Sequence, residues 1–170
     1  MHERKYCWQR ILLHWLSAVL ILWVLLSDLC VALMDVERST YERISGFNAA
    51  ICVLYIPLFL LRCLLYRLCT QREVGPAGQP LKLMVCTVHE ALYLSTAAAL
   101  LSGVLMIRRE VDVLGWFIVP ALLDDPLWLD IWFELHRVSR ALLTVLLLVH
   151  VGAVVVQGYQ GRNVLRRMLP

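Results

Sequence analysis

The chain has 170 residues, with 16 Lys+Arg against 13 Asp+Glu and a hydrophobic content of 61%. Water-soluble domains contain about 45–50% apolar residues, so this composition argues against a soluble globule. The apolar residues lie in continuous blocks of about 20, as membrane-spanning helices require, and do not alternate as in an outer-membrane β-barrel. A net charge of +3 without a basic run of five or more residues also argues against a nucleic-acid partner.

Four membrane spans are predicted, in chain order, over about residues 11–31, 45–65, 85–107 and 133–157. Each is long enough to cross about 30 Å of hydrocarbon at about 1.5 Å per residue. Residues 70–80 form a polar loop with glycines and prolines, and the apolar stretch 113–123 is too short to cross and is expected to lie at the interface. Residues 1–170 are therefore predicted to form a single all-α domain, a four-helix transmembrane bundle with a short interfacial segment between helices 3 and 4.

The basic residues beside these spans predict that both termini are cytoplasmic. With the N-terminus inside, ten of them face the cytoplasm: Arg4, Lys5, Arg10, Arg62, Arg67, Arg72, Lys82, Arg162, Arg166 and Arg167. Six face the outer side: Arg38, Arg43, Arg108, Arg109, Arg137 and Arg140. This asymmetry follows the positive-inside rule.

Histidines inside the predicted spans are the main candidates for a functional site, because ionisable residues are costly in hydrocarbon. His14 lies in the first turn of the first span, and His150 lies near the inner end of the antiparallel fourth span. The two are therefore expected at matching depth. His136 precedes His150 by 14 residues, on the same helix face and about 21 Å away. Two facing imidazoles in a helix bundle can ligate a low-spin b-type haem; the alternative is a core histidine with a polar partner.

Three segments resemble the bacterial cytochrome b-561 family: Arg10-x-x-x-His14-Trp15-Leu, the His136-x13-His150 pair, and Asn-Val-Leu-Arg-Arg-Met-Leu-Pro at residues 163–170. That family is similar to the cytochrome b subunits of membrane hydrogenases and formate dehydrogenases, and the resemblance covers essentially the whole chain. It implies a bacterial inner-membrane protein with two b haems that works with ubiquinone or another quinone. By this resemblance, His14 and His150 hold the iron of the inner haem. His136 and a histidine of the second span hold the outer one.

The chain departs from this pattern because its second span has no histidine. Counting back from Arg62, which resembles a family arginine, places Asn48 at the position of the missing ligand. An amide is a poor iron ligand, and the favoured interpretation is that Asn48 and Ser45 start and cap the second helix. The outer haem is then absent, five-coordinate through His136, or completed by another side chain. The candidates for that side chain are Cys52, Met34 and Met106.

Three further residues at the inner side are candidate contacts of a haem propionate or a quinone. His89 opens the third span beside Glu90, where it could hydrogen-bond a propionate, relay protons or bind quinone. An interfacial pair that simply reaches water is the alternative. Arg10 and Arg62 could pair with propionates, although the positive-inside rule places arginines here without any haem.

The leading functional prediction is a membrane b-type cytochrome that transfers electrons between a donor and quinone. The family that the chain resembles includes a superoxide:ubiquinone oxidoreductase, and this resemblance favours an electron-transfer oxidoreductase. One alternative is a haem-bearing membrane anchor or relay subunit for a soluble dehydrogenase, and a more remote one is a haem-free transport component. Membrane lipid, quinone and a redox partner protein are the expected partners, and a homodimer is left open.

Overall fold

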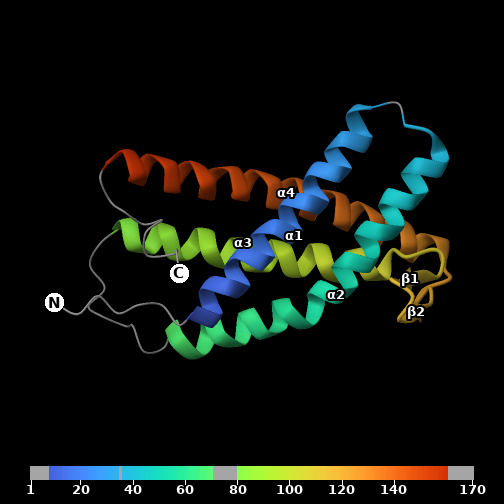
Figure 1. The fold of residues 1–170 in the computed structure, drawn as a ribbon, viewed down its shortest axis with the longest axis horizontal. Coiled ribbons are helices and arrows are strands. Elements are labelled where there is room, and N and C mark those ends of the chain that lie inside the picture. Colours follow the sequence, from blue (N-terminus) through green and yellow to red (C-terminus); the bar gives the residue numbers. More distant parts are fainter. Residues whose placement is uncertain (1–7, 35, 71–79, 161–170) are drawn as a thin grey trace.

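The computed structural model describes residues 8–34, 36–70 and 80–160 and consists mainly of four long helices (Figure 1). They are α1 (Trp8–Leu33), α2 (Arg38–Thr70), α3 (Pro80–Leu105) and α4 (Pro126–Tyr159). All four are long and apolar enough to cross a membrane. The predicted all-α four-helix bundle is confirmed. The loop expected over most of 70–80 and the motif at 163–170 lie outside the described residues.

All four helices begin before the residues predicted from the sequence. The largest differences are in α2, which begins at Arg38 and not near 45, and in α4, which begins at Pro126 and not near 133. Asp125 caps α4, since its Oδ1 accepts a 2.8 Å hydrogen bond from the Leu127 N–H. Pro126 fits the first turn, where a missing N–H costs nothing. Hydropathy locates the apolar part of a helix and therefore misses the polar first turns of α2, whereas the start of α4 is set by the Asp125 cap and Pro126.

The apolar segment between the third and fourth helices contains a β-hairpin that the sequence analysis did not predict. β1 (Val111–Val113) pairs antiparallel with β2 (Phe117–Val119). Between the strands, Leu114 and Gly115 both have positive φ, 54° and 76°, a conformation that glycine adopts at no steric cost. β1 packs against α2, and Val113 is completely buried there. The hairpin therefore closes one end of the bundle.

The helices pack as two antiparallel pairs, α1 with α2 and α3 with α4, and α2 also contacts α3. In Figure 1 the first pair lies obliquely across the second. Tyr55 and Phe59 of α2 and Leu100 of α3 form the buried centre between the pairs. The starts of α1 and α3 and the ends of α2 and α4 lie toward one end of the bundle, opposite the hairpin (Figure 1). We call this the inner end, following the predicted orientation, and the hairpin end the outer end.

An even number of spans places both chain ends on one side of the membrane, and the basic asymmetry predicts the cytoplasmic side. A fluorescent protein that matures only in the cytoplasm should therefore fluoresce when fused after Pro170. Alkaline phosphatase, which is active only outside the cytoplasm, should be inactive at the same position. An active phosphatase fusion with a dark fluorescent fusion would contradict the orientation.

Candidate functional site

Four pairs of residues, one pair on each helix, define two levels in the bundle interior. The inner level consists of His14, Arg62, His89 and His150. The outer level consists of Asp28, Asn48, Gly103 and His136. On every helix the two members are 14 residues apart, which corresponds to a rise of about 21 Å and a rotation about 40° short of four turns. Each helix therefore turns the same face to both levels.

Three imidazoles from three helices meet at the inner level. The ring centroids of His14 and His150 are 6.4 Å apart, and those of His89 and His150 are 5.1 Å apart. All three residues line a cavity of about 510 Å³, within the range of about 300–1,000 Å³ typical of ligand pockets. The structure thus brings together the two histidines predicted at matching depth, and adds His89 to them.

Arg62 connects the inner histidines to α3. Its Nη2 lies 3.2 Å from Nδ1 of His14, and its Nε donates to the Tyr93 hydroxyl, also at 3.2 Å. The guanidinium carbon lies 5.1 Å from the centre of the Tyr93 ring. Sequence reasoning missed Tyr93, although its position four residues after His89 places both on one face of α3. Arg10, in contrast, is not among the residues that line the cavity.

The contact with Arg62 sets the protonation of the His14 ring. A guanidinium can only donate hydrogen bonds, so Nδ1 of His14 accepts. A neutral imidazole then carries its proton on Nε2. For the neutral ring to ligate a metal through Nε2, the proton would have to move to Nδ1, and Arg62 would have to release that nitrogen.

The inner level fits the axial ligands of a b-type haem. Metal–imidazole bonds are about 2 Å long and a ring nitrogen lies about 1 Å from its centroid, so imidazoles on opposite sides of one metal have centroids about 6 Å apart. The separation of 6.4 Å between His14 and His150 agrees with this arrangement. The 5.1 Å between His89 and His150 is too short for it.

At the outer level, Asn48 does not cap a helix, and that interpretation was wrong. α2 begins at Arg38, which puts Ser45 two turns and Asn48 nearly three turns inside it. Asn48 is 6% exposed, and its Nδ2 donates to Ser27 Oγ at 2.8 Å and to Asp28 Oδ1 at 3.1 Å. Asn48 therefore connects α2 to α1.

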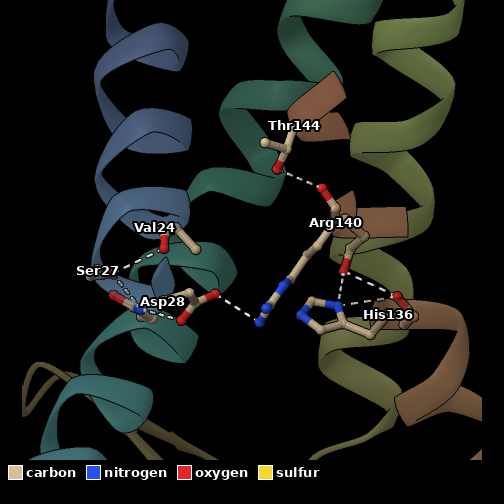
Figure 2. Close-up of polar contacts among 9 residues, drawn as sticks. Val24, Ser27, Asp28, His136, Arg140 and Thr144 are labelled. Carbon is tan, nitrogen blue, oxygen red and sulfur yellow. Dashed lines mark hydrogen bonds and ion pairs between the residues drawn. The ribbon is translucent and has the colours of Figure 1, made fainter. Parts of the chain in front are cut away.

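An ion pair that sequence reasoning missed joins α1 to α4 at the outer level. Arg140 Nη1 lies 2.8 Å from Asp28 Oδ2, and Figure 2 shows the Arg140 side chain between Asp28 and His136. The two side chains are 38% and 23% exposed, respectively. An acid in one span and a base in another was the available signal, because charged groups inside membranes usually pair.

His136 is fixed against α3. Its Nδ1 lies 3.0 Å from the Ala99 carbonyl oxygen and 3.3 Å from Ser102 Oγ. A carbonyl can only accept, so Nδ1 carries the proton and Nε2 keeps its lone pair. A Cβ atom at Gly103 would come within 3.1 Å of the His136 ring, which explains why the smallest residue stands there.

A shared layer separates the two levels. Ile21, Thr96 and Leu143 each lie seven residues from both levels on their helices and line the inner cavity as well as a smaller one beside His136 and Arg140. The smaller cavity has a volume of about 50 Å³. The cavity beside His136 and Arg140 therefore has about one tenth of the volume of the inner cavity, although the same helices build both.

Four apolar helices that bring imidazoles together around an internal cavity are typical of a membrane cytochrome b. A comparison with profiles of protein families matches residues 5–170 to the family described as prokaryotic cytochrome b561. The chain belongs to the prokaryotic cytochrome b561 family, and is thus a bacterial multi-pass membrane protein of a class that binds b-type haem and transfers electrons. A comparison with curated proteins finds no match.

No group of three or more His, Cys, Asp or Glu suited to a metal ion occurs in the described part of the chain. Haem iron needs only two axial side chains, because the macrocycle supplies its other bonds. The donor set of the inner level is therefore suited to haem and not to a metal bound by protein alone.

Replacing Gly103 with Ala should destabilise the protein. The added methyl would press on an imidazole that its hydrogen bonds hold in place, and such overpacking costs about 1–3 kcal/mol, against about 1 kcal/mol gained in helix propensity. Gly46→Ala is the matched control, because no atom lies within 4 Å of the Cβ position there. The melting temperature in detergent should fall for Gly103→Ala and stay equal or rise for Gly46→Ala. Equal effects would show that His136 is free to move.

Proposed function

We propose that the protein carries haem b at the inner level, with His14 and His150 as its axial ligands, and transfers electrons between a redox partner and membrane quinone. The observation that carries this proposal is the 6.4 Å separation of the two imidazoles across the inner cavity. When bound, the haem supplies one-electron exchange through its iron. The protein supplies the ligands, the charge balance and a dry environment.

Arg62 is proposed to exchange partners when the cavity fills. Its guanidinium holds Nδ1 of His14, and this nitrogen must be released before Nε2 can ligate. A haem propionate is a stronger acceptor for the guanidinium than an imidazole is, because the hydrogen bond is then charged on both sides. Tyr93 remains bonded to Nε and keeps Arg62 at the cavity wall.

His89 is proposed to serve the quinone and not the iron. It lines the same cavity but lies too close to His150 for a metal between the two rings. A neutral imidazole has one nitrogen that donates a proton and one that accepts a proton, and the neighbouring Glu90 is exposed at the inner end. His89 can therefore pass a proton between the surface and a quinone that is being reduced or oxidised.

The apolar side chains of the cavity exclude water from this chemistry. Trp15, Phe59 and Leu147 line it from three helices. An apolar shell of this kind raises the strength of the polar contacts inside it and influences the potential of the haem. The expected role is therefore that of an electron carrier whose haem site and quinone site share one cavity.

Single replacements of the three inner histidines should distinguish the axial ligands of the haem iron from a histidine that only lines the cavity. His14→Ala and His150→Ala should each abolish the low-spin reduced-minus-oxidised spectrum of the inner haem, because one axial bond is lost. His89→Ala should retain that spectrum and slow the reaction with quinone. A low-spin spectrum that survives in His14→Ala but disappears in His89→Ala would assign the ligands differently.

Removing the charge of Arg62 should weaken haem binding without changing the ligands. Hydrogen bonds to charged groups contribute about 1.5–3 kcal/mol, so Arg62→Met should lower haem affinity about tenfold or more. Arg67→Met is the matched control, since Arg67 is exposed one turn further along α2. Haem titration of the apoprotein measures both. Equal affinities in the two variants would remove Arg62 from the site.

The electron-transfer proposal is tested by mixing the reduced protein with a soluble ubiquinone analogue in a stopped-flow instrument. Oxidation of the haem should follow quinone concentration and slow in His89→Ala. A haem that is oxidised at the same rate with and without quinone would contradict quinone as the electron acceptor. A protein that instead copurifies with a soluble dehydrogenase and needs it for turnover would favour the anchor subunit.

A further inference from the structure

We propose that Asp28 and Arg140 have replaced a second haem at the outer level, so that the chain carries haem at the inner level alone. Exclusion of haem from the outer level is argued from the outer residues, whereas the presence of haem at the inner level rests on the proposed function. The sequence left three possibilities for the outer haem: absent, five-coordinate, or completed by another side chain. The proposal is that it is absent, and the ion pair supplies the physical cause.

The cavity that His136 lines is too small for a macrocycle. The cavity beside His136 measures about 50 Å³, against about 510 Å³ beside His14 and His150. A liquid water molecule takes about 30 Å³, so the outer cavity can hold one or two waters. The same four helices build both levels, and the difference therefore comes from the side chains.

The Arg140 side chain fills the space that a haem on His136 would need. Arg140 follows His136 by one turn of α4, and Figure 2 shows it between the imidazole and Asp28 of α1. α1 and α4 make no extensive backbone contact with each other. The ion pair of 2.8 Å thus crosses the same gap that separates His14 from His150 at the inner level.

Neither partner of the ion pair can move aside at low cost. A carboxylate or guanidinium left alone in hydrocarbon is strongly destabilising, whereas a paired one is tolerated. Asp28 is held a second time by Nδ2 of Asn48, the residue at the position of the missing histidine. Asn48, Asp28 and Arg140 therefore form one polar network at this level.

The imidazole of His136 does not itself exclude a metal. Its Nδ1–H donates to the Ala99 carbonyl, a second contact often found on metal-ligating histidines. What opposes haem is the neighbouring guanidinium and the lack of volume. Two buried polar atoms in the described network, Asn48 Oδ1 and Arg140 Nε, have no hydrogen-bond partner.

The haem content of the purified protein and of His136→Gln tests this proposal. Gln keeps a donor for the Ala99 carbonyl but does not ligate haem iron. Both proteins should contain one haem per chain, by pyridine haemochrome assay, and share one redox component and one spectrum. Two haems per chain in the unmodified protein overturn the proposal, as does a haem signal that disappears in His136→Gln while the His14-dependent signal remains.

A second measurement tests the ion pair as the cause. Asp28→Asn and Arg140→Gln should each lower the melting temperature more than the double variant does, because each single change leaves a charge unpaired. If the losses of the two single variants add up in the double variant, the ion pair is not the cause.

Asn48→His should still contain one haem. A second low-spin haem in that variant would overturn the claim that Arg140 and Asp28 exclude haem from the outer level. Because His14→Ala tests the inner haem and His136→Gln the outer level, each proposal can fail alone.

Discussion

Hydrocarbon offers no hydrogen bond to a polar side chain, so the ionisable groups inside this bundle depend on partners from other helices. Arg62 illustrates this at one level, where it connects His14 of α1 to Tyr93 of α3. Asp28 does so at the other level, where it accepts from Asn48 of α2 and pairs with Arg140 of α4. These contacts hold together helices that the apolar side chains, which pack equally well against lipid, would leave loosely associated.

The gap between α1 and α4 gives the two levels their different chemistry. At the inner end it is bordered by imidazoles and stays open, and at the outer end a long side chain bridges it. The helices and their faces are the same in both places, so the backbone does not decide what each level can bind. Four side chains, two histidines at one end and an acid and a base at the other, decide it.

The sequence predicted the four helices and the approach of His14 to His150, because span lengths and antiparallel order determine depth. It did not predict where the helices begin, because hydropathy does not register the polar first turns of α2 or the cap of α4. The error in α2 produced the wrong interpretation of Asn48 as a cap. The charges of Asp28 and Arg140 in two spans indicated that each needs a partner, but a single sequence does not show which charge meets which, so their contact was not predicted. The hairpin was missed because its strands have only three residues each.

The ion pair at the outer level also bears on how the protein relates to the energy stored across the membrane. A charge that crosses the full bilayer does electrical work of about 2.3 kcal/mol per 100 mV of potential. A carrier with redox centres at both levels could move electrons over the intervening rise of about 21 Å and so take part in that work. Under the proposal that an ion pair takes the place of the second centre, electrons would enter and leave near one surface. The turnover of such a carrier would not depend on the membrane potential, so its rate would be the same in energised and de-energised cells.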